Sequence, residues 1–177
     1  MSHVLIDSPA LEHRIAQLAR ELRHDAGPAT SLHLVAVLKG AFVFLADLLR
    51  AMEGPVTCDF IALSSYGGRT STSGEVRVTK DLDEAVAGRD VVIIEDIVDT
   101  GVTLTYLQDI LRARGPRSLR TMCLLSKPSR RQVDVPVDYI GFTIDDRFVV
   151  GYGLDFDERF RNLPHIVTLD EDEQELT

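Results

Sequence analysis

The sequence lacks several features of secreted, disulfide-rich or membrane-bound proteins. It has no tryptophan and only two cysteines among its 177 residues. Because Cys58 and Cys123 lie far apart inside apolar runs, we expect buried thiols in a reducing cytosol, with a disulfide or a metal-binding pair as the alternative. The N-terminus shows no charged-then-apolar signal pattern, and no apolar segment approaches the ~20 residues that span a bilayer.

Positive charge is also scarce. Lysine and arginine number 19 against 28 acids, so the formal net charge is -9 at pH 7. This balance argues against general binding of nucleic acid, which depends on contacts with phosphates. Part of the negative charge lies in the stretch 170–175, which we interpret as a solvated tail. The remaining composition, with 45% hydrophobic residues, suits one cytoplasmic domain spanning residues 1–177.

Apolar residues alternate between helical spacing and short continuous runs. The helical spacing predicts helices over 9–24 and 42–52 and a third that starts near Leu104 and stops at Gly115-Pro116. Ser8 is the expected N-cap of the first helix, since Pro9 follows it. The short runs predict strands over 32–38, 56–63, 91–94, 119–125, 139–142, 148–152 and 166–169. This alternation favours an α/β fold with a mainly parallel central sheet, flanked by helices on both faces.

The stretch EDIVDTGVTL, residues 95–104, gathers acids, hydroxyls and a glycine where a buried strand is expected to end. Ligands bind at the carboxyl ends of strands in such sheets. The loop from Thr100 to Thr103 precedes a helix whose first backbone N–H groups bind anions, and Gly101 lets the backbone come close to a ligand. These features predict a phosphate cradle. The alternative is an ordinary helix cap, since the Gly-Lys-Ser/Thr ending of a Walker loop is missing.

The two acids beside this cradle need an explanation, because they would repel a phosphate. Glu95 and Asp96 make sense if they accept hydrogen bonds from sugar hydroxyls, or help to hold a Mg²⁺ ion that the phosphates also bind. A phosphorylated sugar therefore fits both parts of the stretch. The alternative of a solvated acidic loop is weakened by the apolar strand that comes directly before it.

Five separated motifs carry a resemblance to a known family: VLKGAFVFLADLL, SSYGG, EDIVDTGVTL, LLSKPSR and DDRFVVGYGLDFDERFRNLPHI. Together they resemble the phosphoribosyltransferases, and among these the bacterial hypoxanthine-guanine (6-oxopurine) type. The resemblance covers roughly residues 32–169. It implies a type I phosphoribosyltransferase-like fold with a small hood over the base. It also implies purine salvage, in which ribose 5-phosphate passes from phosphoribosyl pyrophosphate (PRPP) to hypoxanthine or guanine.

The resemblance implies which residues bind PRPP. The glycine-threonine loop would hold the 5-phosphate, the paired acids would take the ribose hydroxyls, and a Lys39-Gly40 peptide that is cis in the family would bind pyrophosphate together with an arginine. Val102 stands where animal members carry lysine, and we expect little loss because the backbone does most of the cradling. The residues implied for PRPP and its phosphates are Lys39, Gly40, Glu95, Asp96, Asp99, Thr100, Gly101, Val102, Thr103 and Arg161.

The resemblance also implies the purine site. Asp99 would be the catalytic residue beside N7 of the purine, where it handles the proton, and Lys127 would donate to the 6-oxo group. Phe148 would stack on the ring, and the backbone of Val149 would meet its far edge. Taken alone, Phe148 would be interpreted as a core residue and Lys127 as an exposed turn residue. The residues implied for the purine are Lys127, Phe148, Val149 and Asp155.

Two further expectations depend on the same resemblance. Glu95, Asp96 and Asp155 would hold Mg²⁺, although Asp155 and Arg161 alone could be a surface ion pair of little energetic value. Ser65 and Tyr66 would begin a mobile loop within the polar segment 64–81, where 75–78 alternates like one arm of a hairpin. Closure is needed because water easily traps the sugar cation.

Alternative functions and the assembly remain open. A relative that prefers xanthine is one alternative. A non-catalytic regulator that senses PRPP or binds RNA is another, disfavoured by the acidic balance and by the complete set of site residues. The resemblance implies a homodimer or homotetramer. Asp145 and Asp146 are interpreted as turn residues.

Overall fold

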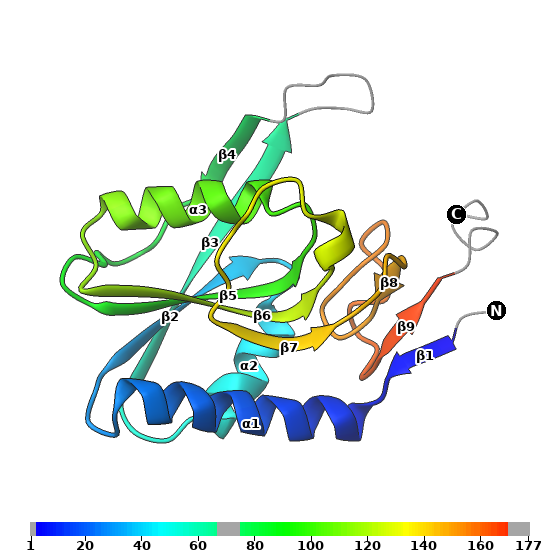
Figure 1. The fold of residues 1–177 in the computed structure, drawn as a ribbon, viewed down its shortest axis with the longest axis horizontal. Helices are drawn as coiled ribbons and strands as arrows, with labels where there is room; N and C mark the ends of the chain where they lie inside the picture. Colours follow the sequence, from blue (N-terminus) through cyan, green and yellow to red (C-terminus); the bar gives the residue numbers. More distant parts are fainter. Residues whose placement is uncertain (1–2, 67–74, 170–177) are drawn as a thin grey trace.

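A computed structural model describes residues 3–66 and 75–169. Its main element is a six-stranded sheet in the order β4-β3-β2-β5-β6-β7 (Figure 1). Five of these strands run parallel, and β4 pairs with β3 in antiparallel fashion, which confirms the predicted mainly parallel sheet. The strands are β2 (Leu32–Leu38), β3 (Val56–Tyr66), β4 (Glu75–Lys80), β5 (Asp90–Val98), β6 (Ser118–Ser126) and β7 (Tyr139–Thr143).

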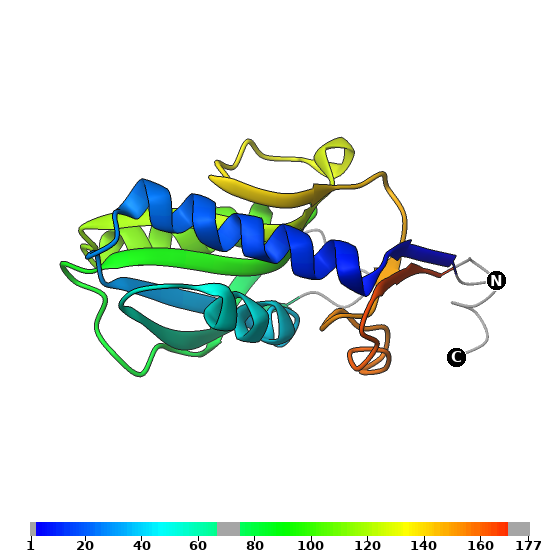
Figure 2. The same ribbon diagram turned by 90° about the horizontal axis from the view of Figure 1, so that it is seen from below.

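Helices cover both faces of this sheet, as the sequence predicts (Figures 1 and 2). α1 (Ser8–Ala26) and α2 (Phe42–Ala51) lie on one face, and α3 (Val102–Ala113) lies on the other. Alternate residues of β5 face opposite sides, so that Val92 and Ile94 pack with α1 and α2 while Val91 and Ile93 pack with α3. A strand buried on both faces needs a continuous apolar run, which explains the run in the sequence. No helix in the described ranges is long and apolar enough to cross a membrane.

A second, smaller sheet forms a hood. It has the order β1-β9-β8, in which β1 is His3–Ile6, β8 is Val149–Val150 and β9 is Ile166–Thr168. Both pairings are antiparallel. Its small core includes Val150 and Val167. Figure 1 shows this sheet next to the carboxyl ends of β5, β6 and β7, which is where the resemblance places a hood over the base.

Several predicted element boundaries were wrong. β5 continues through Glu95 and Asp96 to Val98, because its backbone stays paired with β6 beyond the end of the apolar run. The N-cap of α1 is Asp7, not Ser8: the Asp7 carboxylate accepts from Ala10 N at 2.9 Å. The Ser8 hydroxyl instead donates to the carbonyl of Pro164 at 2.7 Å.

The two cysteines differ in burial. Cys123 is buried, and burial raises the pKa of its thiol to about 12, whereas Cys58 is exposed on β3. The prediction of two buried thiols was therefore wrong for Cys58, because an apolar run in the sequence does not show which face of a strand is covered. The predicted hairpin arm is confirmed, since Ser65 pairs with Val76 and Tyr66 with Glu75.

Two of the predicted segments lie outside the described residues. The centre of the predicted loop, 67–74, and the acidic stretch 170–175 are both outside the described ranges. A single domain over residues 1–177 stays a prediction.

Candidate active site

The expected phosphate cradle lies between β5 and α3. Gly101 is the N-cap of α3 and has φ 87°. The Val102 N–H makes only a long hydrogen bond of 3.4 Å to Thr100 Oγ1, and the other amides of the first turn have no partner within the helix. A Cβ at Gly101 would lie 2.9 Å from Val135 Cγ1 and 3.1 Å from Val133 O, so the position requires glycine twice over. A cavity of about 150 Å³ opens here, lined by Glu95, Ile97, Val98, Asp99, Thr100, Gly101, Thr103 and Leu104.

The paired acids lie near the carboxyl end of β5, where Glu95 lines this cavity and Asp96 is the next residue. Glu95 is buried, and burial, followed by the charge of Asp96, raises its pKa well above the usual range. Burial also raises the pKa of Asp96 to about 6, against a hydrogen bond from Ile97 N–H that favours the charged form. A bound cation, or hydroxyl groups that donate hydrogen bonds, would stabilise the charged forms of these two neighbouring acids.

The loop after β2 contacts Asp96 and the hood at the same time. A Cβ at Gly40 would lie 1.5 Å from Asp96 Oδ2, and a Cβ at Gly153 would lie 2.3 Å from Gly40 O. Glycine at both positions is therefore what brings these three segments together. The peptide bond between Leu38 and Lys39 is cis. The predicted Lys39-Gly40 cis bond was wrong by one residue, because the motif located the loop but not the bond within it.

Arg161 lies on the hood side of this contact. Its Nη1 donates to Gly153 O at 2.8 Å, and its Nη2 lies 2.9 Å from Asp155 Oδ1. The charges of Arg161 and Asp155 both shift the pKa of Asp96, the first downward and the second upward. The structure thus brings together the predicted PRPP residues of the Lys39-Gly40 loop, β5 and the 153–161 segment. In the described ranges, no three His, Cys, Asp or Glu side chains form a metal-binding group by themselves.

Of the predicted purine residues, Lys127 directly follows β6, whereas Phe148 and Val149 lie at the start of the hood strand β8. Lys127 is buried, with only 7% of its surface exposed, so the alternative of an exposed turn residue was wrong. Its backbone N–H donates to Val98 O at 3.0 Å, which ties it to the loop that carries Asp99. Phe148 is 39% exposed, so its interpretation as a core residue was also wrong. Its ring packs edge to face against the ring of Phe156, with 5.4 Å between the ring centroids.

Two arginines next to this site were missed. Arg130 Nε lies 3.0 Å from Asp99 Oδ1, and its Nη1 lies 3.6 Å from Asp146, which the sequence left as a turn residue. Arg131 donates to the carbonyls of Val98 and Asp99 at 2.5 Å each. Its other terminal nitrogen donates to Ser126 Oγ at 2.8 Å, so Arg131 fastens the Asp99 loop to the end of β6. Two adjacent arginines shortly after a proline are typical of an exposed turn. No local sequence pattern indicates that they contact the Asp99 loop and the end of β6.

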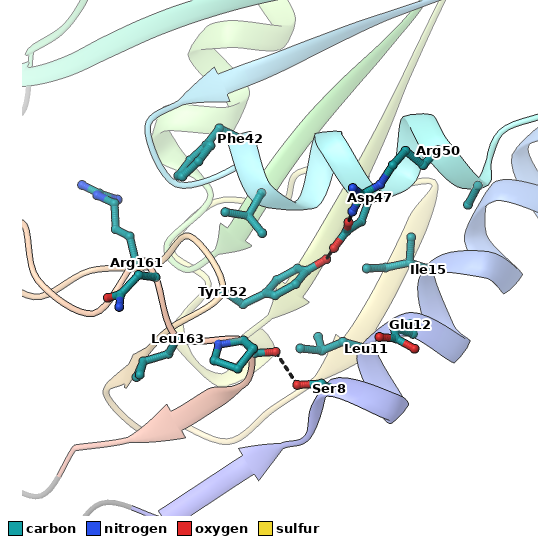
Figure 3. A pocket seen from close by; sticks show the side chains of 14 residues that line it. Ser8, Leu11, Glu12, Ile15, Phe42, Asp47, Arg50, Tyr152, Arg161 and Leu163 are labelled. Atoms are coloured by element: carbon teal, nitrogen blue, oxygen red, sulfur yellow. Dashed lines mark hydrogen bonds and ion pairs between the residues drawn. The ribbon is translucent and has the colours of Figure 1, made fainter.

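A larger groove of about 840 Å³ lies beside the site, between α1, α2 and the segment 152–164 (Figure 3). Tyr152 crosses it from the hood segment, and its hydroxyl donates to the carboxylate of Asp47 on α2. Tyr152 has φ 52°, a left-handed conformation that a bulky residue keeps only when its surroundings fix it. The Asp47 contact therefore helps to fix the backbone next to Gly153. Neither residue was predicted, because their partnership exists only in the folded chain.

Ser65 and Tyr66, the predicted start of the mobile loop, are the last two residues of β3. Their backbones pair with β4, as described above. The rest of the predicted loop falls largely on 67–74, outside the described residues. Closure over the site stays a prediction.

The fold and the site define a class of protein. A mainly parallel sheet, a small hood, and an anion cradle beside two acids form the architecture of a type I phosphoribosyltransferase. The family model described as "Phosphoribosyl transferase domain" matches residues 4–157. The chain is 47% identical over 174 residues to the hypoxanthine phosphoribosyltransferase of Salmonella typhimurium, covering 95% of this chain and 97% of that protein.

Two further relatives narrow the class. The chain is 51% identical over 172 residues to the hypoxanthine-guanine phosphoribosyltransferase of Mycobacterium avium, covering 94% of this chain and 85% of that protein. A solved hypoxanthine-guanine phosphoribosyltransferase from Bacillus anthracis matches with a TM-score of 0.90 and 43% identity, covering 95% of this chain and 98% of that one. The chain therefore belongs to the hypoxanthine-guanine phosphoribosyltransferase family.

Proposed function

We propose that the chain transfers ribose 5-phosphate from PRPP to hypoxanthine or guanine, giving IMP or GMP and pyrophosphate. One observation carries this proposal. The cradle at the start of α3, the acids Glu95 and Asp96, and the buried Lys127 meet at one edge of the sheet. An anion site, a hydroxyl-binding site and a donor for a base are the three things that a phosphorylated sugar and an oxopurine need.

PRPP binding uses the backbone and the acids. The amides from Thr100 to Thr103 hold the 5-phosphate, with the threonine hydroxyls as further donors. Glu95 and Asp96 accept from the ribose hydroxyls. Lys39, the Gly40 amide and Arg161 neutralise the departing pyrophosphate as its bond to the sugar loosens.

Mg²⁺ fits this site as a cofactor shared with the substrate. Mg²⁺ in phosphate sites uses one or two protein carboxylates together with substrate phosphates, so a closed protein cage is not needed. Asp96 and Asp155 come from different segments and are close enough for the charge of Asp155 to raise the pKa of Asp96. These two acids, with Glu95, would hold the ion. When bound, Mg²⁺ supplies positive charge that stabilises the leaving pyrophosphate.

The purine is bound by side chains from three loops, those after β5 and β6 and the one before β8. Lys127 donates to the 6-oxo group, and Asp99 takes the proton at N7 as the new bond forms. Phe148 stacks on the purine, and the Val149 backbone meets its far edge. Ser65 and Tyr66 close over the reacting centre and keep out water that would trap the sugar cation.

Pyrophosphate release with PRPP and a purine panel tests the proposal. We expect turnover with hypoxanthine or guanine and far less with adenine. Preference for xanthine would support the first alternative. PRPP binding without any release would support the non-catalytic regulator. RNA binding by such a regulator is disfavoured by the net charge of -9.

We also propose that the protein is a homodimer or homotetramer in the cytoplasm. Light scattering would measure the assembly, and cell fractionation would test the location.

A further inference from the structure

One carboxylate contacts both cations of the proposed pyrophosphate region. Glu158 Oε2 lies 2.7 Å from Lys39 Nζ, and Glu158 Oε1 lies 3.3 Å from Arg161 Nη2. The two cations come from different parts of the chain, since Lys39 follows β2 and Arg161 belongs to the hood segment. A single side chain with two oxygens therefore bridges them, as an arriving phosphate group would.

The backbone presents Glu158 in this position. Asp157 and Glu158 have φ values of 51° and 61°, in the left-handed region that residues other than glycine rarely adopt. The Glu158 N–H donates to Asp155 Oδ2 at 2.9 Å, which helps to fix this turn. Such conformations persist only where the surrounding structure determines them, and they cluster at functional sites. The turn thus holds the Glu158 backbone close to both cations, and from there its side chain reaches Lys39 and Arg161.

We propose that Glu158 is a competing carboxylate that occupies the pyrophosphate region between turnovers and yields it to pyrophosphate. This inference rests on the proposed function, which assigns Lys39 and Arg161 to that group. Pyrophosphate and Glu158 cannot both pair with the same two cations, because each is an anion and the two would repel one another. Glu158 must withdraw when PRPP binds, and it returns when pyrophosphate leaves.

The consequence is weaker binding and faster release of pyrophosphate. Without Glu158, Lys39 would lose its acidic partner and Arg161 would keep only Asp155, so less negative charge would compete with the incoming or departing anion. The Lys39 and Glu158 side chains are 63% and 64% exposed, so water and salt screen their attraction. An exposed ion pair contributes up to about a fivefold factor in an equilibrium, so we expect a total effect of roughly three- to tenfold.

The test compares two neutralising substitutions on the same turn. Glu158→Gln removes the bridging charge, and Asp157→Asn removes the charge of the neighbouring residue, which pairs with Arg159 at 3.8 Å instead. The dissociation constant and release rate of pyrophosphate are measured in the presence of Mg²⁺ by calorimetry and stopped flow. We expect Glu158→Gln to bind pyrophosphate and PRPP roughly three- to tenfold more tightly and to release pyrophosphate more slowly. Asp157→Asn should stay within about twofold of wild type, and the difference should shrink as salt rises.

The outcomes separate this inference from the proposed function. A wild-type protein that binds neither PRPP nor pyrophosphate overturns the proposed function itself. Wild-type binding together with an unchanged or weaker Glu158→Gln variant overturns the competing role alone, provided that thermal melting shows the variant folded. Equal gains in Glu158→Gln and Asp157→Asn would assign the effect to net charge and would also overturn it.

Discussion

The candidate site has two halves that are built from different parts of the chain. The half that we propose for the 5-phosphate, from Thr100 to Thr103, offers mainly backbone amides at the start of α3. The half that we propose for the base and pyrophosphate relies more on charged side chains, three of which already have acidic or basic partners. In this half Asp99 pairs with Arg130, Arg161 with Asp155, and Lys39 with Glu158.

The difference follows from what each half must do in the proposed reaction. The 5-phosphate is present in both PRPP and the nucleotide, so its binding group can be fixed before the reaction and stay unchanged through it. The pyrophosphate leaves and the purine loses a proton, so charges in the other half must change partners. Side chains in exposed ion pairs can exchange partners at low cost, whereas the hydrogen bonds of a helix hold the amides of its first turn in place. Side-chain substitutions should therefore impair activity mainly in the base-and-pyrophosphate half. Substitutions that alter the backbone should impair PRPP binding in the 5-phosphate half.

Removal of divalent metal should have the largest effect. The leaving pyrophosphate carries several negative charges, and Lys39 and Arg161 are already compensated by acids. We expect activity to fall to background in excess chelator and to return when Mg²⁺ is added. Steady-state release of pyrophosphate measures this. Full turnover in chelator would show that the side-chain half needs no metal.

Replacing Asp99 by asparagine should have the next largest effect. The shape is kept, but the proton acceptor is lost, and general acid-base groups contribute ~10²–10⁴-fold. We expect kcat to fall by that range while the dissociation constant of PRPP changes little. Arg130→Gln is the matched control, because it breaks the same exposed ion pair and leaves the acceptor in place. An equal loss of kcat in both variants would mean that Asp99 acts only through Arg130.

Lys127→Ala should change the choice of purine. A 6-oxo group is an acceptor and lysine is donor-only, whereas adenine offers a second donor at that position. A hydrogen bond to a charged group is worth roughly 1.5–3 kcal/mol, so kcat/KM for hypoxanthine and guanine should fall on the order of 10²-fold. Activity with adenine should fall much less, so the ratio narrows. An unchanged ratio would show that Lys127 does not read the 6-position.

The sequence predicts the halves of the site unequally. Periodicity predicts β5 and α3, although not the full length of β5, and the glycine and hydroxyls between them predict the cradle. The resemblance adds Lys127 and Phe148, which taken alone would be assigned to a turn and to the core. The burial of Lys127 and the exposure of Phe148 exist only in the fold.

The unpredicted residues are those that act through partners distant in the sequence. Arg131 contacts carbonyls more than thirty positions earlier in the chain, and Glu158 meets Lys39 across 119 positions. From the sequence alone, Arg131 and Glu158 would be predicted to be solvated surface charges, because an ion pair between distant residues leaves no local sequence pattern. Small backbone details were missed for a similar reason. The predicted positions of the cis peptide bond and of the N-cap of α1 were each one residue too late, because neighbouring residues offer the same local chemistry.

Gly101→Ala tests the backbone half directly. The substitution places a Cβ at φ 87° and within 2.9 Å of Val135 Cγ1, and a left-handed L-residue costs roughly 1–2 kcal/mol before any clash. We expect KM for PRPP to rise about tenfold or more, with a smaller change in kcat. Gly88→Ala is the control, since it has φ 70° but open space around its Cβ. If both variants keep wild-type KM, the cradle does not depend on this backbone.

Substitution of Val102 should have the smallest effect, and it is the sharpest test of the comparison. Val102 is the first residue of α3 and is 37% exposed, and in the proposed cradle only its backbone amide faces the 5-phosphate. Val102→Ala removes the side chain and keeps the amide, and alanine is the better helix former, so KM for PRPP and thermal stability should stay within about twofold and a few degrees of wild type. Val102→Lys adds an exposed cation near the phosphate, whose attraction salt screens, so any gain should be at most about fivefold and should vanish at high ionic strength. A tenfold rise in KM for Val102→Ala would show that a side chain holds the 5-phosphate. The two halves would then no longer differ in construction, and the fixed backbone could not explain why one phosphate stays bound while the other leaves.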